Sequence, residues 1–464
     1  MDGGTDAAGG VRVGLPPLPR TRTGRTRRAA VAQLSALAAA GTLAAGCGIG
    51  GHPAPRAGGE LRGQITLYGW DQEPISGTRR RAFDGFRARH PQLTVEQVTT
   101  GAAGNVYFEK IQSLIAGDAA PDMFIIRDSD LPYFLTRKLA MNLDPLVKRD
   151  KYDLSDFPKG AIETYRYQGG LYGLPDNITS NGFFVNVELF ERAGLAPPPV
   201  QPSEKTWTFE AFRDQVQQLV NRTRSDPPTF GVLPVYGVNG MLAWVRSNGG
   251  DLLTKDALGT ALDSAGAIEA MQLLADLRHR YRVAPTPQDL QGTNAQALFE
   301  AGRLAIWEGC VCQVGRFRQN AQFRWDAAFR PAGKAGLVDH LFAYPQLLYA
   351  GSRNPDAAWE ALKWFEDEGM KLLTAEGALQ GTKMNAHQRA LFVDPTKPPR
   401  NAGLWVTSVE KYGRTPPSTT NWNEVETALN AALTPLWDGQ RTALDAAQAV
   451  KQTVDPLLRA GKWG

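Results

Sequence analysis

The stretch from residue 64 to residue 98, QITLYGWDQEPISGTRRRAFDGFRARHPQLTVEQV, alternates between two kinds of residue spacing, and this alternation indicates the fold class. It opens with QITLYGW, a short run of β-forming residues that predicts a strand. The middle has helical spacing, and there Ser76 can cap the helix while Pro91 can end it. The stretch closes with LTVEQV, which predicts a second strand. Strand, helix and strand in this order are typical of a parallel sheet.

The alternation continues on the C-terminal side. NVYFEKIQSLIAG (105–117) predicts a helix, and DMFIIRD (122–128) predicts a strand whose apolar centre suits burial on both faces. A second series opens with NGFFVNVELFERAGL (181–195), a strand that runs into a helix. We therefore expect an α/β fold, with parallel strands and helices on both faces of the sheet.

Residues 1–46 have the layout of a secretory signal peptide. The arginine-rich RTRTGRTRR (20–28) precedes the apolar run AAVAQLSALAAAGTLAAG, which ends just before Cys47. Gln33 and Ser35 interrupt this run, so it is a poor membrane span. LAAGC resembles the bacterial lipobox, with Ala44 where that pattern usually has leucine, which implies that Cys47 is lipidated.

Residues 47–60 are rich in glycine and proline, which suits a flexible tether behind a lipid anchor. TRRAAVA also resembles a twin-arginine export signal, although its last three residues differ from the usual pattern. The alternative for Cys47 is an unmodified thiol beside an ordinary cleavage site.

Composition excludes several classes of protein. The chain has 464 residues, of which 42% are hydrophobic and 21% charged, as in a soluble globular protein. The net charge of +4 comes partly from the leader, so the mature protein is nearly neutral and lacks the charge of a nucleic-acid binder. About 400 residues remain after the leader, enough for two domains. No later stretch has 18 continuous apolar residues.

The three cysteines do not predict a metal site. Cys310 and Cys312 lie two residues apart, too close for an unstrained disulfide in regular backbone, so we expect small buried side chains on a strand. The five histidines never fall at the spacing of metal ligands.

Several segments resemble one known family. The run GLYGLPDNITSNGFFVNVELFERAGLAPPP (170–199) is similar to the signature of bacterial extracellular solute-binding proteins of family 1, the maltose-binding-protein type. Other segments resemble the family and occur in the family's order: AGDAAPDMF (116–124) before this run, and LFEAGRLAIWEG (298–309) and NPDAAWEALKWF (354–365) after it. The resemblance covers the chain from about Leu61 to its end, and departs from the family around VDHLFAYPQLLYA.

The resemblance implies two discontinuous α/β lobes joined by a hinge that the chain crosses three times, the type II periplasmic-binding-protein-like fold. Carried over to this sequence, the first lobe comprises residues 61–180 and 332–385. The second lobe comprises residues 181–331 and 386–464.

A protein that holds a sugar needs aromatic surfaces for the C–H faces of the ring and planar polar groups for its hydroxyls. In open α/β sheets a ligand lies beyond the carboxyl ends of the strands. The candidates that follow predicted strands or lie in the family's segments are Trp70, Asp71, Asp128, Asn177, Asn181, Trp244, Arg246, Asn248, Trp307, Glu308, Tyr344 and Arg389. The alternative for the tryptophans is core packing, and for the aspartates and asparagines it is loop stabilisation.

The resemblance implies an exported lipoprotein on the outer face of the cytoplasmic membrane, which captures a carbohydrate for an ABC importer. We expect a monomer whose partners are the solute and the permease subunits, with no cofactor, metal, catalytic residue or nucleic acid. An alternative solute is a glycerol phosphate, for which Arg246 is the basic candidate. A glycoside hydrolase would need paired carboxylates such as Asp71 and Glu308, and an adhesin or structural lipoprotein is a third class.

Overall fold

In the computed structural model of the chain, the described residues are 61–461, apart from 102–103, 204, 226, 378, 380 and 383–385. The leader and Cys47 lie outside the described residues, so the signal peptide, lipid anchor and tether stay predictions. Within the described part, no helix is both long enough and apolar enough to span a bilayer.

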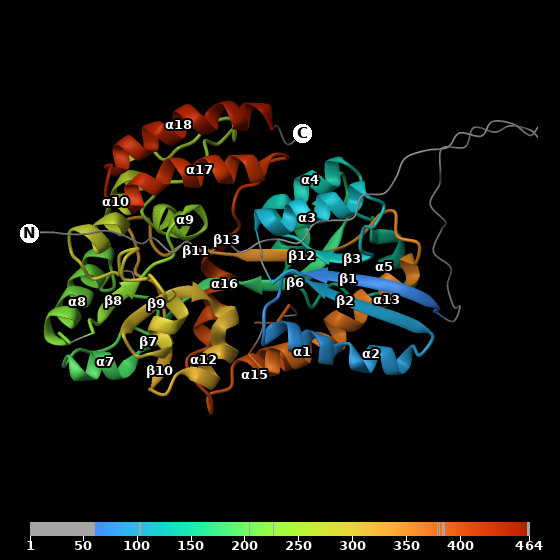
Figure 1. Cartoon of the computed structure of the whole chain (residues 1–464), viewed down its shortest axis with the longest axis horizontal. Helices are drawn as coiled ribbons and strands as arrows, with labels where there is room; N and C mark the ends of the chain where they lie inside the picture. Colours follow the sequence, from blue (N-terminus) through green and yellow to red (C-terminus); the bar gives the residue numbers. More distant parts are fainter. Residues whose placement is uncertain are drawn as a thin grey trace, which may run out of the picture. The chain divides into compact units, whose positions relative to one another are not determined.

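The first sheet has the strand order β2-β1-β3-β12-β6. Strands β1, β2 and β3 are parallel, as the opening stretch predicts, whereas β12 runs antiparallel to β3 and to β6. Figure 1 shows α3 and α4 on one side of this sheet and α1 and α2 on the other. The strands are β1 (Gly63–Gly69), β2 (Leu93–Thr99), β3 (Met123–Ile125), β6 (Gly173–Thr179) and β12 (Phe342–Leu348).

The second sheet has the strand order β10-β7-β9-β8. β7 is antiparallel to both of its neighbours, and β8 and β9 are parallel. Since β6 ends at Thr179 and β7 begins at Asn181, Ser180 carries the chain from one sheet to the other. The strands are β7 (Asn181–Asn186), β8 (Phe230–Leu233), β9 (Leu304–Cys310) and β10 (Trp325–Ala328). Two smaller pairs are β4 (Arg166–Tyr167) with β5 (Gly170–Leu171), and β11 (Asp339–His340) with β13 (Gly413–Arg414).

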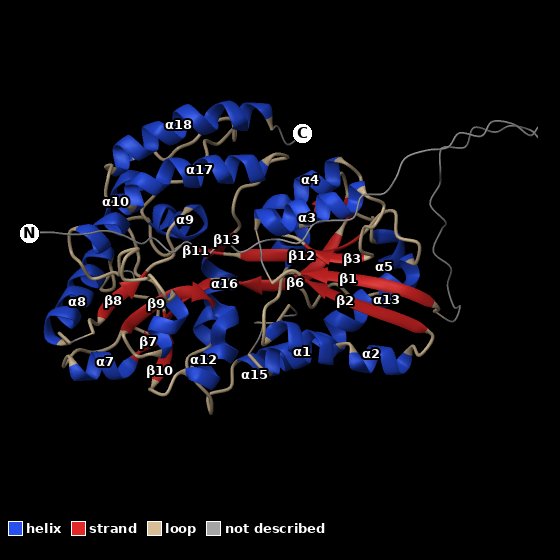
Figure 2. Ribbon diagram, viewed as in Figure 1, coloured by secondary structure: helices blue, strands red, loops and turns tan. Residues whose placement is uncertain are grey.

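Helices surround both sheets (Figure 2). We call each sheet, with the elements packed against it, the first and the second lobe; the residue limits expected for the lobes stay a prediction. The helices are α1 (Ile75–Ala82), α2 (Asp84–Arg89), α3 (Asn105–Ala116), α4 (Leu131–Thr136), α5 (Asp144–Asp150), α6 (Lys159–Thr164), α7 (Val187–Arg192), α8 (Phe209–Arg222), α9 (Val238–Ser247), α10 (Ala265–His279), α11 (Ala295–Glu300), α12 (Val314–Asn320), α13 (Pro355–Trp364), α14 (Met370–Ala375), α15 (Ala386–Phe392), α16 (Gly403–Tyr412), α17 (Trp422–Trp437) and α18 (Ala443–Ala460). The 3₁₀ helices η1 (Asp128–Asp130) and η2 (Val311–Gln313) and the π-helix η3 (Phe365–Gly369) complete the set.

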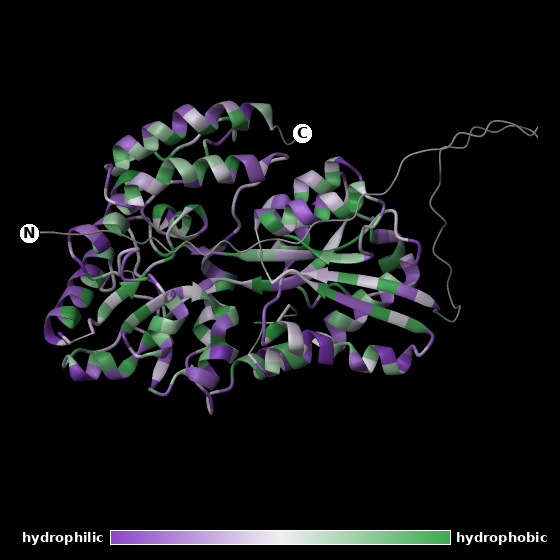
Figure 3. Ribbon diagram, in the orientation of Figure 1, coloured by the Kyte–Doolittle hydropathy of each residue, from purple (hydrophilic) through white to green (hydrophobic). Residues whose placement is uncertain are grey.

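Separate apolar cores support the two lobes. One cluster joins β1, β3 and β12 to α3, α13 and α14, whereas two clusters cover the two faces of the second sheet. Helices α17 and α18 alternate hydrophobic and hydrophilic residues along their length (Figure 3). Their apolar side chains, such as Leu429, Leu433 and Val450, are buried in the core of the second lobe. These contacts place α17 and α18 in the second lobe.

Two local predictions are wrong. Ser76 does not cap its helix, because α1 begins at Ile75 and the Ser76 hydroxyl donates instead to Glu73. Cys310 and Cys312 are not free buried thiols but form a disulfide. The backbone is not regular there: β9 ends at Cys310 and the chain turns at once into η2, which brings the two Cα atoms to 5.1 Å.

Candidate functional site

Aromatic side chains gather at the carboxyl end of the first sheet. Trp70 directly follows β1, and its ring meets that of Tyr344 edge-on, with centroids 5.4 Å apart. Because β12 is antiparallel to β3, its first residues lie beside the ends of the parallel strands. Tyr344 is in register with Asn177 of β6. The structure thus brings three predicted residues, Trp70, Tyr344 and Asn177, to one edge of the sheet.

This grouping extends into what we call the aromatic row, formed by Trp70, Tyr344, Phe342 and His340. Ring centroids of Tyr344 and Phe342 are 5.6 Å apart, and His340 stacks on Phe342 at 3.9 Å. Trp70 and Tyr344 are half-buried, whereas Phe342 and His340 are buried, and burial lowers the pKa of His340 to about 3. Phe342 and His340 were not among the predicted residues. The signal was present, since aromatic rings at every second residue of DHLFAYP share one face of an extended chain.

Asp128 fastens the loop after β3 to the start of β12. Its carboxylate accepts hydrogen bonds from the amides of Ser129, at 2.8 Å, and Ala343, at 3.3 Å. The residue is buried, and this burial raises the pKa of its carboxyl to about 7. Asp128 therefore lies next to the aromatic row and positions β12, the strand that bears Phe342 and Tyr344.

Arg127 connects the two lobes beside this row. Its guanidinium donates to Glu426 Oε2 at 2.5 Å and to Asn423 Oδ1 at 2.9 Å, both in α17 of the second lobe. Within the first lobe it also pairs with Asp130 at 2.7 Å. Glu426 in turn accepts from Asn239 of α9 at 2.7 Å. Arg127 and Glu426 were not among the predicted residues, although Arg127 lies two residues after the buried strand β3.

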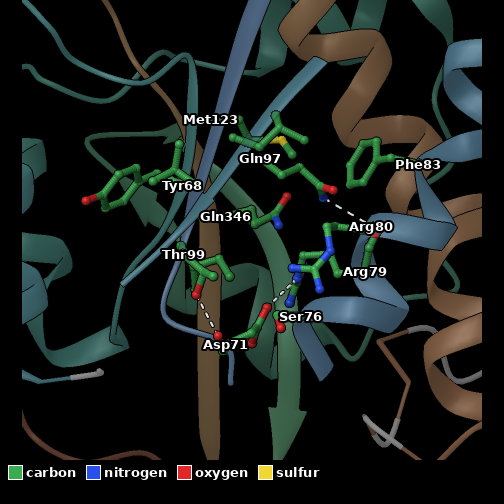
Figure 4. A pocket seen from close by; sticks show the side chains of 14 residues that line it. Tyr68, Asp71, Ser76, Arg79, Arg80, Phe83, Gln97, Thr99, Met123 and Gln346 are labelled. Atoms are coloured by element: carbon green, nitrogen blue, oxygen red, sulfur yellow. Dashed lines mark hydrogen bonds and ion pairs between the residues drawn. The ribbon is translucent and has the colours of Figure 1, made fainter. Parts of the chain in front are cut away.

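Asp71 belongs to a buried ionic network (Figure 4). Arg79 donates to Asp71 at 2.5 Å and to both carboxylate oxygens of Asp176, at 2.6 and 3.1 Å. Gln346 donates to Asp176 at 2.7 Å, and burial raises the pKa of Asp176. The neighbouring cavity between α1 and the first sheet measures about 30 Å³, which holds a few water molecules and no sugar ring. Asp71 therefore neutralises Arg79 in this structure.

The tryptophans predicted in the second lobe lie in its cores. Trp244 is 2% exposed, packs against Phe212 and donates through its indole to Glu308 at 3.2 Å. Trp307 is 5% exposed and packs against Phe184. Both faces of the second sheet are covered, so neighbouring residues of the inner strand β9 are buried alike. The structure shows these two rings as core residues.

Glu308 is likewise engaged inside the second lobe. Its carboxylate pairs with Arg330 at 2.7 Å and accepts from the amide of Val235 at 3.3 Å. Burial raises the pKa of Glu308, while Arg330 opposes that shift. Glu308 thus serves as a buried counter-ion and fixes the loop that precedes α9.

The remaining predicted residues make local contacts. Arg246 pairs with Asp251 at 2.9 Å and donates to the carbonyl of Thr415 at 2.8 Å. Asn248 follows α9 and donates to the carbonyl of Gly266 at 3.0 Å. Asn181 is buried at the start of β7, opposite Cys310, and Arg389 pairs with Glu410. Among the described residues, no three His, Cys, Asp or Glu side chains are grouped as a metal would require.

Known proteins of the same fold are numerous. A binding protein of Brucella abortus is 24% identical over 402 residues, which cover 82% of this chain and 89% of that protein. The structure of an ABC substrate-binding protein of Listeria monocytogenes in complex with cycloalternan has a TM-score of 0.78 at 23% identity, and covers 86% of this chain and 100% of that one. UgpB of Mycobacterium tuberculosis in complex with glycerophosphocholine has a TM-score of 0.73 at 15% identity, and covers 86% of this chain and 99% of that one.

These structures have the two-lobe, periplasmic-binding-protein-like fold that the resemblance implies, so the predicted fold class is confirmed. The profile of one sequence family, moreover, matches residues 69–371. This chain belongs to the family of bacterial extracellular solute-binding proteins.

Proposed function

We propose that this protein captures a carbohydrate between its lobes and delivers it to an ABC importer. The observation that carries the proposal is the aromatic row, whose half-buried members Trp70 and Tyr344 lie at the carboxyl end of the first sheet. Aromatic faces suit the C–H patches of a sugar ring, and this edge of an α/β sheet is where ligands bind. The likeness to a structure that holds cycloalternan supports the same class of solute.

The charges near the row favour an uncharged solute. Arg127 is surrounded by Asp130 and Glu426, and Arg246 is engaged by Asp251. A phosphate ligand would need a cation with unsatisfied donors. The likeness to UgpB, which holds glycerophosphocholine, makes such a solute the second candidate. A hydrolase finds no support, because Asp71 and Glu308 are bound to different arginines in different lobes.

The cellular setting that we propose rests on the sequence. Cys47 carries the lipid, residues 1–46 are removed on export, and residues 47–60 tether the protein outside the cytoplasmic membrane. Export by the twin-arginine route, a monomeric state and contact with permease subunits belong to the same proposal. The lobe limits at residues 180, 331 and 385 complete it.

Isothermal titration against a panel of neutral oligosaccharides and glycerophosphocholine tests the solute. We expect an oligosaccharide to bind with a Kd on the order of micromolar, about 8 kcal/mol. Trp70→Ala should weaken that affinity by roughly 10-fold or more, since one stacking contact contributes about 1–3 kcal/mol. Trp364→Ala is the matched control, because this half-buried indole packs against Phe86 at 6.1 Å, away from the aromatic row. Silence across all sugars, or equal effects of the two substitutions, would contradict the proposal.

A further inference from the structure

The disulfide between Cys310 and Cys312 lies where the chain links the two lobes. Cys310 is the last residue of β9 and pairs with Asn181, the residue that follows the passage at Ser180. Both cysteines are half-buried, so neither is enclosed in a core. We propose that this disulfide is a redox-modification site that exchanges with dithiols and sets the rigidity of the connection between the lobes.

Backbone hydrogen bonds hold the turn at Val311 and the helix α12 that follows it. The amide of Val311, between the two cysteines, donates to the carbonyl of Ser180 at 3.3 Å. The amide of Gly315 donates to the carbonyl of Gly377 at 3.0 Å. Gly377 follows α14, whose apolar side chains belong to the core of the first lobe. The turn is therefore attached to both lobes.

The contact at Gly315 is also tight. A Cβ added to Gly315 would lie 2.8 Å from the carbonyl oxygen of Glu376. Such close packing of two backbones tolerates little change in the path of η2 (Val311–Gln313). A covalent restraint on η2 thus bears directly on how firmly α12 is held against the first lobe.

Both sulfurs accept hydrogen bonds that would stabilise them as leaving thiolates. The amide of Cys312 donates to Cys310 Sγ at 3.2 Å, and Gln313 Nε2 donates to Cys312 Sγ at 3.6 Å. Hydrogen bonds to a thiolate favour its charged form. A thiolate of an external dithiol attacks one sulfur, forms a mixed disulfide and releases the other cysteine as a thiolate. The second thiol of the reductant then displaces the first cysteine. The protein gains two electrons and two protons, and the reductant becomes a cyclic disulfide.

Reduction removes the covalent link between the side chains of Cys310 and Cys312, which are separated by one residue. Without this cross-link the turn is less restrained, and its hydrogen bonds open more often. We expect the amides of Val311 and Gly315 to exchange their hydrogens about tenfold faster in the dithiol state. The lobes themselves stay folded, because their cores do not include the two sulfurs.

The test combines thiol trapping with hydrogen exchange on the full chain. The protein is equilibrated in buffers of stated reduced-to-oxidised dithiothreitol ratio, and one sample is trapped with N-ethylmaleimide for peptide mass spectrometry. A parallel sample is examined by hydrogen–deuterium exchange. As the buffer becomes reducing, the peptide with Cys310 and Cys312 should gain two adducts, and peptides spanning residues 309–316 should exchange faster. Peptides from β1 and β2 should not change.

Two variants sharpen the outcome. Cys312→Ser should exchange rapidly in every buffer, whereas Cys47→Ser, which keeps the pair, should respond like the wild type. A pair that cannot be trapped until the protein unfolds would overturn the proposal, and so would trapping without faster exchange at residues 309–316. If Cys312→Ser does not fold, the wild-type titration alone decides. No solute is present, so failure here is distinct from failure of the proposed function.

Discussion

The raised pKa of the single residue Asp128 predicts how the stability of the protein depends on pH. Its carboxyl has a pKa of about 7 in the folded chain, against about 3.9 in an unfolded one. Between these values the folded state binds more protons, so the free energy of unfolding falls as pH rises through this window and is flat above it. Asp128→Asn lacks this dependence. Relative to the variant, the wild type should lose about 2 kcal/mol between pH 5 and pH 8.

Urea unfolding of both proteins at the two pH values measures this difference. Comparison at equal pH cancels other titrating groups, including His340, whose lowered pKa acts in the opposite direction. Parallel stability curves for wild type and variant would show that the carboxyl of Asp128 is charged throughout.

Several acidic residues near the predicted site form ion pairs with buried arginines. In the first lobe Arg79 lies between Asp71 and Asp176, and in the second Arg330 lies between Glu308 and Asp339. Removing one member of such a group leaves an uncompensated buried charge, which costs about 3–5 kcal/mol. These carboxylates therefore have a structural role whether or not a solute is bound.

Helix α9 packs so closely against the preceding loop that a substitution at Gly240 should destabilise the protein. Replacing a glycine inside a helix by alanine usually stabilises the helix by about 1 kcal/mol. At Gly240 the new Cβ would lie 1.8 Å from the carbonyl oxygen of Val235, in a loop that Glu308 holds in place. Gly240→Ala should therefore lower the free energy of unfolding by about 1–3 kcal/mol.

Gly160→Ala is the matched control for this element. Gly160 also lies in the first turn of a helix, α6, but nothing lies within 4 Å of the added Cβ. Thermal unfolding should show a lower Tm for Gly240→Ala and an equal or higher Tm for Gly160→Ala. Equal shifts in both variants would mean that α9 can move away from the Val235 loop at little cost.

Hydrogen bonds between the lobes should affect the balance between closed and open forms of the whole molecule. Glu426 of α17 accepts from Arg127 of the first lobe, and a second link joins Asn105 to Thr427 at 2.8 Å. The side chains of Arg127 and Glu426 are only 12% and 7% exposed, so solvent screens their attraction weakly. Glu426→Gln should shift the balance between closed and open lobes by roughly 10-fold toward the open form.

Small-angle scattering without solute should then give a larger radius of gyration than for the wild type, and titration should give a Kd weaker by up to about 10-fold. Glu424→Gln, at an exposed residue of the same helical turn, should change neither quantity. Identical scattering from all three proteins would mean that the pair with Arg127 does not contribute to closure.

The order and type of the elements in the first lobe could be predicted from local patterns. Runs such as QITLYGW and DMFIIRD report burial through their spacing, and spacing is a local property. The position of Trp70 after the first strand could also be predicted, because the carboxyl ends of parallel strands meet at one edge of the sheet. Membership of the solute-binding family followed from the order of its segments.

Which side chains face one another became known from the three-dimensional fold. Trp244 and Glu308 follow the family's pattern, yet they bond to each other inside the second lobe. Arg127 and Glu426 are 299 residues apart and meet only because two lobes meet. The disulfide of Cys310 and Cys312 depended on a turn that strand periodicity did not predict. Periodicity tells how deeply a residue is buried, but its partner depends on contacts between distant segments, which no local pattern contains.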